Sequence, residues 1–280
     1  MPLVAVSTGL RLHYEEAGRG PSLLFTDGVG AGWVWFKNVG PLSQRFRVVV
    51  LDGRGTGLSD KPPGPYSIPV MARELVDVIE RLGLGPAHVV GLSIGGQVAL
   101  EAALEYPAAI ASVIPVGAGP GAPLEVPPSP ATALRLAQFP WLTPEQNFLR
   151  NISAALSPGY LASHPGELAL IERLALQAPT PLYARLAIGA ASAVWRGLVG
   201  RAAGLRQPVL VLSGQLDQIA PLPNALALAR LLPQARLHIF PGSGHLCQIE
   251  QADAFDAVLT GFLLGGGQPV FVPVHGGGQI

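Results

Sequence analysis

The chain is poor in cysteine and in charge. Its 280 residues hold one cysteine, Cys247, and the 18 basic residues balance the 18 acidic ones, so the formal net charge is +0. Basic residues that are scattered singly offer no charged face to phosphates, and we expect no nucleic-acid partner. One cysteine cannot form an internal disulfide or a zinc cluster, and the six histidines lack short metal-ligand spacings. We therefore predict no structural metal.

Uninterrupted apolar runs of membrane-spanning length are also missing. The two long uncharged stretches, residues 106–124 and 257–280, are broken by prolines and glycine clusters. The N-terminus, residues 1–4, has no basic region followed by an apolar run and a small-residue cleavage site. The sequence predicts a soluble, cytoplasmic protein with no membrane partner, and it assigns no oligomeric state.

What the chain does have is apolar residues in regular patterns. Hydrophobic residues make up 49% of the chain and the mean hydropathy is +0.39, enough for a substantial core. Runs that are apolar on both faces alternate with segments of helical spacing, which predicts a mostly parallel sheet covered by helices on both sides. The predicted strands are residues 4–7 and 10–15, paired as a hairpin, then 22–26, 47–51, 87–91, 110–116, 208–213 and 235–240. The clearest predicted helices are 70–82, 94–106, 222–232 and 252–264.

One segment interrupts this alternation. Residues 119–205 are proline-rich at first and then rich in alanine and leucine with helical spacing, which predicts a helical cap inserted into the core. The core is then formed by residues 1–118 and 206–264. Residues 265–280 form a glycine-rich tail, expected to be loosely held, in which residues 270–272 could add an edge strand.

The most informative motif is G-x-S-x-G at residues 91–95, where a predicted strand runs straight into a predicted helix. Glycine on both sides of Ser93 permits a turn so tight that the hydroxyl stands above the sheet at the helix N-terminus. There the helix dipole and the free N–H of Ile94 can stabilise negative charge. We predict that Ser93 is a nucleophile, and the alternative is a serine that only caps the helix.

A serine nucleophile needs a base, and the base needs an orienting acid. His245 lies in a glycine-flanked loop after the strand 235–240, and Asp217 follows the strand 208–213. Both positions come after strand ends, where open parallel sheets place their ligands. The order Ser93, Asp217, His245 predicts a catalytic triad. The rivals of Asp217 as the acid are Asp52, Asp60 and Glu125.

These motifs resemble the α/β-hydrolase fold family along nearly the whole chain. Besides 91–95, residues 52–60 (DGRGTGLSD) are similar to the family segment D-x-R-G-x-G-x-S-D. The resemblance implies that Asp52 and Arg54 of this segment are structural and hold down the loop beneath the active site. The stretches 59–66, 91–96 and 244–251 look most like 3-oxoadipate enol-lactonases and related small esterases.

The chain departs from the family at one place. The family has His-Gly after the strand that ends near Thr26, whereas this chain has Asp27 and Gly28. The oxyanion hole is expected to use the backbone N–H of Val29, or alternatively Gly28, together with that of Ile94. A carboxylate aimed at the oxyanion would oppose catalysis, so we expect Asp27 to accept hydrogen bonds from the loop backbone instead.

The resulting functional prediction is a serine hydrolase that cleaves ester or lactone bonds of small, largely apolar substrates without a cofactor. The alternatives are a cofactor-free perhydrolase, a C–C bond hydrolase, or a non-catalytic receptor for a small ligand on the same fold. Low charge in the cap predicts an apolar pocket roof. The candidate pocket residues are Trp33 and Trp35, close after the oxyanion loop, and Trp141 and Trp195 of the cap.

Overall fold

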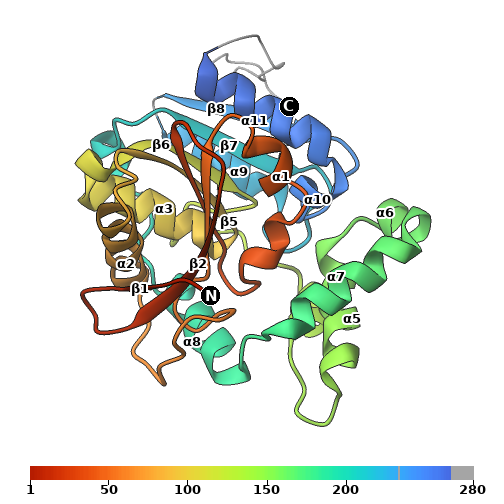
Figure 1. Cartoon of the computed structure of the whole chain (residues 1–280). Helices are drawn as coiled ribbons and strands as arrows, with labels where there is room; N and C mark the ends of the chain where they lie inside the picture. The colour runs from red at the N-terminus through yellow and green to blue at the C-terminus, as the bar shows by residue number, and fades with distance from the viewer. Residues whose placement is uncertain (233, 266–280) are drawn as a thin grey trace.

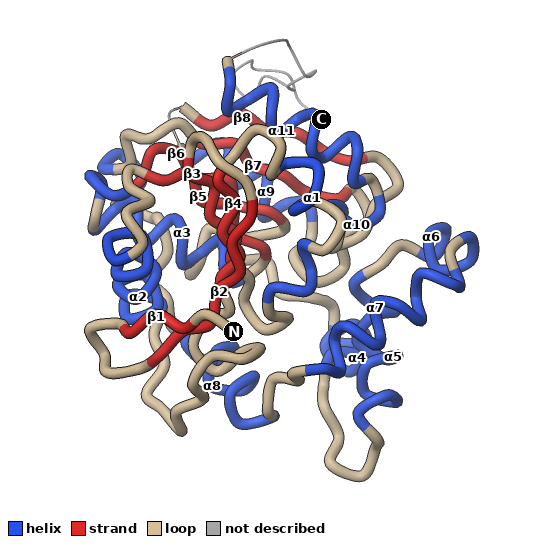
Figure 2. The backbone as a smooth tube through the Cα atoms, viewed as in Figure 1, coloured by secondary structure: helices blue, strands red, loops and turns tan. Residues whose placement is uncertain are grey.

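A mixed sheet forms the centre of the molecule. The computed structural model describes residues 1–232 and 234–265. Within them lies an eight-stranded sheet with strand order β1-β2-β4-β3-β5-β6-β7-β8, drawn as the red core of Figure 2. The strands are β1 (Leu3–Ala5), β2 (Arg11–Ala17), β3 (Ser22–Thr26), β4 (Arg47–Leu51), β5 (Ala87–Leu92), β6 (Ile110–Val116), β7 (Val209–Gly214) and β8 (Ala235–Phe240).

The direction in which the chain adds successive strands reverses in the middle of the sheet. β1 and β2 pair antiparallel at one edge, and every pairing from β4 to β8 is parallel. The chain passes from β3 outward to β4, then returns across β3 to β5 and continues toward β8. The loops that follow β3 and β5 therefore leave the sheet side by side at the point where the direction reverses, which is where open α/β sheets bind ligands.

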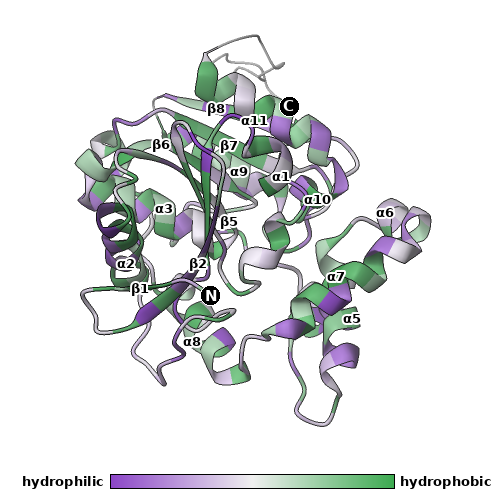
Figure 3. Ribbon diagram, in the orientation of Figure 1, coloured by the Kyte–Doolittle hydropathy of each residue, from purple (hydrophilic) through white to green (hydrophobic). Residues whose placement is uncertain are grey.

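Alternate residues of the central strands enter two separate hydrophobic clusters. Leu24 and Val89 belong to one cluster, whereas Phe25 and Val90, their neighbours in the chain, belong to the other. Helices α2 (Ile68–Arg81), α3 (Ile94–Glu105) and α9 (Leu222–Leu231) contribute to the first cluster. The second is covered by α1 (Val39–Leu42), α10 (Cys247–Glu250) and α11 (Ala252–Leu264). In Figure 3 helix α2 carries its hydrophilic residues on the side away from the sheet.

The segment between β6 and β7 is helical. It contains α4 (Pro130–Leu136), α5 (Pro144–Ala155), α6 (Pro158–Ser163), α7 (Pro165–Gln177) and α8 (Leu182–Ala193). We call residues 119–205 the cap segment. Figure 1 shows α5, α6 and α7 as a lobe beside the body of the molecule, whereas α8 lies closer to α2 and β1. Prolines begin α4 to α7, which suits a first turn whose N–H groups have no partner.

The predicted fold class, a mostly parallel sheet flanked by helices, is confirmed. Four short elements of the described residues outside the cap segment were not predicted: α1, α10, η1 (Gly32–Trp35) and η2 (Pro107–Ala109). Each spans only three or four residues, too few to produce a periodic apolar pattern. The predicted edge strand at residues 270–272 lies outside the described residues.

Candidate active site

Ser93 occupies a sharp turn between β5 and α3. Its backbone has φ 57° and ψ −126°, a conformation that non-glycine residues rarely adopt. A Cβ added at Gly91 would lie 2.3 Å from the carbonyl oxygen of Gly95, and one added at Gly95 would lie 2.9 Å from the Cα of Asp27. The two glycines of the motif are therefore required by close backbone contacts, and Ser93 is left half-buried at the cavity wall.

Asp217 and His245 are brought together from the ends of β7 and β8. The Nδ1 atom of His245 lies 2.8 Å from Oδ2 of Asp217, and both side chains are buried. The other carboxylate oxygen, Oδ1, accepts hydrogen bonds from the N–H groups of Ile219 at 2.8 Å and Ala220 at 2.9 Å. The turn that follows β7 fixes the Asp217 carboxylate. The carboxylate can therefore fix the orientation of the His245 imidazole.

The charged form of His245 is stabilised in this environment. Burial by itself would lower the pKa of His245, but the charge and hydrogen bond of Asp217 and the charge of Asp27 outweigh it, so the pKa is raised above its usual range. In the described part of the chain neither the Ser93 hydroxyl nor Nε2 of His245 makes a hydrogen bond, although both residues line the same cavity. Such contacts are often absent until substrate binds.

The loop after β3 passes beside the start of α3. A Cβ added at Gly28 would lie 3.2 Å from the backbone N of Ile94. As the first residue of α3, Ile94 has an N–H without an intrahelical acceptor. Val29 and Ile94 both line the cavity, whereas Gly28 does not. Val29 and Gly28 were the two residues considered as the N–H donor that acts with Ile94 in the expected oxyanion hole. This placement favours the N–H of Val29.

The Asp27 side chain is turned into its own loop. Its Oδ2 accepts a hydrogen bond from the N–H of Gly30, and the side chain is buried at one wall of the cavity. Burial raises the pKa of Asp27 to about 6, although the loop N–H groups and the charge of His245 oppose the shift. The contact with Gly30 is of the kind expected from the sequence, in which a local backbone donor satisfies the carboxylate.

A cavity of about 440 Å³ opens above Ser93 between the sheet and the cap segment. Its wall is mostly apolar, and its polar groups gather near Ser93 and on α5 and α8. Among the described residues that line it, Arg185 is the one lysine or arginine. The apolar lining includes Trp33, Val34, Leu136, Phe148, Ile152, Ala155, Ile219 and Leu246.

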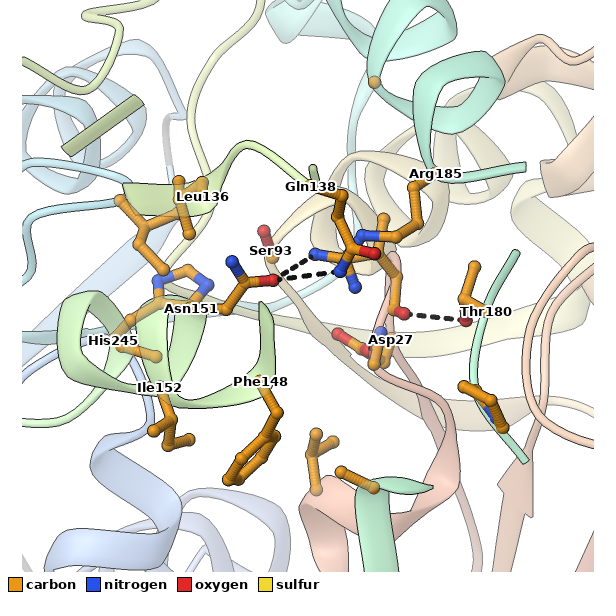
Figure 4. A pocket seen from close by; sticks show the side chains of 18 of the residues that line it. Asp27, Ser93, Leu136, Gln138, Phe148, Asn151, Ile152, Thr180, Arg185 and His245 are labelled. Carbon is orange, nitrogen blue, oxygen red and sulfur yellow. Dashed lines mark hydrogen bonds between the residues drawn. The ribbon is translucent and has the colours of Figure 1, made fainter. Parts of the chain in front are cut away.

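Arg185, on α8, is the residue that sequence analysis missed. Figure 4 shows its guanidinium joined through Asn151 to Gln138: the Oδ1 atom of Asn151 accepts from Arg185 at 2.9 Å and from Gln138 at 3.3 Å. No carboxylate forms an ion pair with Arg185 in the part of the chain that the structure describes. Burial lowers the pKa of Arg185, and the charge of Asp27 opposes this shift. The one sequence signal that could have pointed to Arg185 is that it is the single charged residue of α8.

The predicted tryptophan pocket is only partly correct. Trp33 lines the cavity. The prediction for Trp35 is wrong: it is fully buried in the core, with its ring centroid 4.6 Å from that of Phe25 and 6.2 Å from that of Phe255. The two residues lie in the short 3-10 helix η1, where positions two apart point about 120° away from each other, so only one can face the cavity.

The two cap tryptophans also lie elsewhere. Trp141 is 76% exposed in the connection between α4 and α5 and contacts Phe139. Trp195, just after α8, is buried in the core, and its indole N–H donates to Glu101 of α3 at 3.0 Å. Neither residue lines the cavity. Their positions depend on how the cap helices pack, which helical periodicity does not determine.

Asp52 and Arg54 make the contacts of scaffold residues. Asp52 accepts hydrogen bonds from the N–H groups of Gly32 at 2.8 Å and Leu58 at 2.9 Å, and it also contacts His13. Arg54 forms a buried ion pair with Glu74 of α2. Asp52 thereby connects the loop after β4 to the start of η1, directly after the loop that follows β3.

Residues 1–232 and 234–265 were searched for two features, metal-binding groups of side chains and membrane-crossing helices. No group of three or more His, Cys, Asp or Glu side chains there could hold a metal ion. No helix in that part of the chain is both long and apolar enough to cross a membrane.

The chain belongs to the α/β-hydrolase fold family, whose pattern matches residues 21–252. It is 32% identical over 273 residues to a 2-hydroxy-6-oxononadienedioate/2-hydroxy-6-oxononatrienedioate hydrolase from Burkholderia vietnamiensis, covering 93% of each chain. It is 30% identical to a 2-hydroxy-6-oxo-6-phenylhexa-2,4-dienoate hydrolase from Burkholderia cepacia, covering 92% of this chain and 93% of the relative. The chain is an enzyme of the hydrolase class.

The fold is also similar to that of solved hydrolases. The enol-lactonase from Burkholderia xenovorans LB400 superposes with a TM-score of 0.80 at 26% identity, covering 94% of this chain and all of the other. The predicted likeness to enol-lactonases is therefore confirmed. The curated relatives add a second kind of hydrolase, whose named substrates are hydroxy-oxo-dienoates.

Proposed function

We propose that this enzyme hydrolyses a small substrate that bears one carboxylate and one apolar group, with Ser93 as nucleophile, His245 as base and Asp217 as the orienting acid. The observation that carries the proposal is Arg185, a cation that forms no ion pair with a carboxylate of the described residues and lies in the same cavity as Ser93 and His245. The cytoplasmic location stays a prediction from the sequence.

In the proposed mechanism the substrate carbonyl lies between Ser93 and the N–H groups of Val29 and Ile94. His245 takes the proton of Ser93 through Nε2 as the oxygen attacks, and Asp217 stabilises the imidazolium at Nδ1. The two N–H groups hold the negative charge that develops on the carbonyl oxygen. His245 then returns the proton to the leaving group, and water releases the acyl group from Ser93 by the reverse sequence.

Arg185 would bind the carboxylate of the substrate. A guanidinium in a cavity wall is costly without a directly hydrogen-bonded carboxylate, even though the charge of Asp27 acts on it from nearby. Its planar donors match a carboxylate in a two-bond geometry. Asn151 accepts one N–H of Arg185 and so fixes the orientation of the group without neutralising it. Figure 4 shows Phe148 and Ile152 away from Arg185, on the side where an apolar group would fit.

The first candidate reaction is cleavage of a C–C bond in a 2-hydroxy-6-oxo-dienoate. The substrate named for the Burkholderia cepacia relative contains a ketone, an enol, one carboxylate and a phenyl group. The substrates named for the Burkholderia vietnamiensis relative are dioates, which carry a second carboxylate. None of these names contains an ester or an amide, so hydrolysis by these relatives must break a C–C bond. After the enol becomes a ketone, attack at C6 expels C5 as an enolate that is conjugated with the 2-oxo group. Protonation of that enolate and hydrolysis of the acyl group on Ser93 give two acids and consume one water.

The second candidate is ester or lactone hydrolysis, the reaction that the sequence motifs favoured. It uses the same residues and differs only in the leaving group, an oxygen in place of an enolate carbon. The similarity to the Burkholderia xenovorans enol-lactonase supports it. The curated relatives, at up to 32% identity over 93% of the chain, support the first candidate more. The perhydrolase and receptor alternatives have no observation in their favour.

The deciding experiment compares substrates with and without a carboxylate in the wild type and in Arg185→Gln. For a 6-aryl or 6-alkyl 2-hydroxy-6-oxo-dienoate, or an acid-bearing enol lactone, we expect Arg185→Gln to lower kcat/KM about 10- to 100-fold, mainly through KM, because a charged hydrogen-bonded contact is lost. Neutral p-nitrophenyl acetate is the matched control and should be affected less than about threefold.

Ser93→Ala serves as the inactive reference in the same assays. It should abolish turnover of every substrate and block labelling by a serine-directed fluorophosphonate. Equal loss on acidic and neutral substrates in Arg185→Gln would rule out the carboxylate contact. Turnover by a folded Ser93→Ala protein would rule out the nucleophile.

A further inference from the structure

The peptide unit between Val29 and Gly30 is held at both of its polar ends. Its carbonyl oxygen, on Val29, accepts a hydrogen bond of 2.9 Å from the hydroxyl of Thr180, drawn as a dashed line in Figure 4. Its N–H, on Gly30, donates to the carboxylate of Asp27. Asp27 belongs to the same loop, whereas Thr180 comes from the cap segment, 151 residues away. One peptide is thus fixed jointly by the core and the cap.

The loop needs such fixing because its backbone is strained. Ala31, the next residue, has φ 70° and ψ 178° and is one of two non-glycine residues with positive φ in the described part of the chain. The other is Ser93 itself. L-residues rarely adopt this conformation, and it persists only where the surroundings enforce it. The two contacts on the Val29–Gly30 peptide are among the interactions that hold this strained conformation in place.

The held peptide adjoins the N–H group that the proposed function uses as an oxyanion donor. The N–H of Val29 lies one residue before the held peptide, and the same loop packs against the start of α3, where Gly28 approaches the N–H of Ile94. Both N–H groups must point at one oxygen to stabilise it, and small errors in position cost large factors in rate.

We propose that Thr180 is a positioning residue for the oxyanion hole, acting with Asp27 as a clamp on the Val29–Gly30 peptide. This inference rests on the proposed function, since it presumes that Val29 supplies an oxyanion donor. Thr180 lies between α7 and α8, and Arg185 follows in the early part of α8. The segment that would bind the substrate carboxylate therefore also carries the group that orients the hole.

The test compares Thr180→Val with Thr180→Ser. Valine keeps the shape of threonine and loses the hydroxyl, whereas serine keeps the hydroxyl. We expect Thr180→Val to lower kcat about 10- to 100-fold with KM within about twofold, because one donor of the hole is misplaced. Thr180→Ser should retain kcat within about threefold. A role in folding alone would change the melting temperature and leave kcat of the folded enzyme intact.

A second measurement does not depend on turnover. Amide hydrogen exchange at Gly30 should accelerate in Thr180→Val and in Asp27→Ala, and it should stay at the wild-type rate in Thr180→Ser. Unchanged exchange in Thr180→Val, or equal kcat in the valine and serine variants of an active enzyme, would overturn the clamp. If the wild type neither turns over the substrates nor reacts with the fluorophosphonate, the proposed function fails, and the exchange comparison alone decides whether the clamp exists.

Discussion

Asp217 and Glu125, two candidates for the acid of the proposed triad, differ in their local contacts. Asp217 contacts the imidazole of His245 directly. Glu125, its rival after β6, accepts a hydrogen bond of 2.7 Å from the N–H of Gly121 and so ties together the loop that enters the cap segment. Asp217 is buried and Glu125 is half-buried, and of the two only Asp217 lies within reach of the proposed base.

This difference gives a prediction for matched amide substitutions. Asp217→Asn should lower kcat by up to about 10⁴-fold, because the amide no longer holds the correct tautomer of His245 or stabilises its charge. Glu125→Gln should keep kcat within about threefold. Steady-state kinetics on one substrate, with circular dichroism to confirm folding, decide between them. A silent Asp217→Asn together with an inactive Glu125→Gln would assign the acid to Glu125.

Burial of the charged Asp27 carboxylate costs free energy, and the pH dependence of the free energy of unfolding measures this cost. Burial raises its pKa from 3.8 to about 6, so the folded state binds this proton more tightly than the unfolded state. The stability that Asp27 contributes is therefore greatest below pH 4 and is lost as pH rises through about 6. Asp27→Asn keeps an acceptor for Gly30 and has no charge to bury. We expect it to be more stable than wild type at pH 8, by up to about 3 kcal/mol, and equal near pH 4.

Urea unfolding of the two proteins at several pH values measures this difference, and a gap that does not change with pH would contradict it. The same substitution removes a negative charge that raises the pKa of His245. The acid limb of the kcat/KM profile should therefore move to lower pH in Asp27→Asn, because the base stays neutral further into acid.

Residue-level prediction from sequence agrees with the structure where the determinants are local. The G-x-S-x-G spacing predicts the tight turn at Ser93, and its glycines do make the close contacts that exclude a side chain. The role of Ser93 as nucleophile stays a prediction. Arg185 and Thr180 were not identified, because they reach the cavity only through the packing of the cap segment on the core. Trp35 was misplaced because closeness in sequence to the oxyanion loop does not fix the direction of a side chain.

At the scale of elements, the loop that carries His245 is hydrogen-bonded to the cap segment. Glu250, at the end of α10, accepts hydrogen bonds from the N–H of Gly244 at 2.8 Å and from the N–H of Ser157 at 3.0 Å, and it also accepts from the Ser157 hydroxyl. Leu246 donates to the carbonyl of Ala155 at 3.2 Å. The corner between α5 and α6 therefore contacts the residues on both sides of His245.

We expect Glu250→Ala to disturb the base more than Ser157→Ala does. Removing the carboxylate frees Gly244 as well as the cap corner, so kcat should fall about tenfold or more. Removing only the Ser157 hydroxyl leaves the contact with Gly244, and kcat should fall less than about threefold. Glu250→Gln keeps an acceptor and should restore most of the rate.

The readout that separates positioning from general stability is the pH profile of kcat/KM. It should change in Glu250→Ala, because the surroundings of His245 change, and not in Ser157→Ala. Equal kinetic effects of both alanine variants, with unchanged profiles, would show that Glu250 only stabilises the contact between α10 and the cap segment.

Elements were predictable to the extent that their apolar pattern is long. The strands from β3 to β8 are short apolar runs bounded by turn residues, and α2, α3, α9 and α11 repeat apolar residues over several turns, so the sequence located them closely. α10, one turn long, owes its place to contacts with α11 and η1. No sequence pattern distinguishes it from the loop that carries His245.

On the scale of the whole molecule, the core and the cap segment share their hydrophobic clusters. Ile188 and Trp195 of the cap segment join the cluster that contains Val89, and Phe148 and Ile152 join the one that contains Val90. Polar contacts cross the boundary as well, including an ion pair of Lys37 with Glu167 of α7. Loss of the cap would expose apolar surface on both faces of the sheet, so partial unfolding is unfavourable.

The last prediction is that the core and the cap segment unfold together in one cooperative transition. Leu149 on α5 is 48% exposed, and Cys247 is buried, so a fluorophore can be attached selectively to Leu149→Cys in the folded protein. Its signal should follow the same urea curve as far-ultraviolet circular dichroism, which reports on all helices, because the shared clusters leave neither part a complete core of its own. A fluorophore transition at clearly lower urea than the circular dichroism transition would show that the cap segment is a separate folding unit. In that case Arg185 and Thr180 would leave the active site before the sheet unfolds, and activity would be lost with the fluorophore signal.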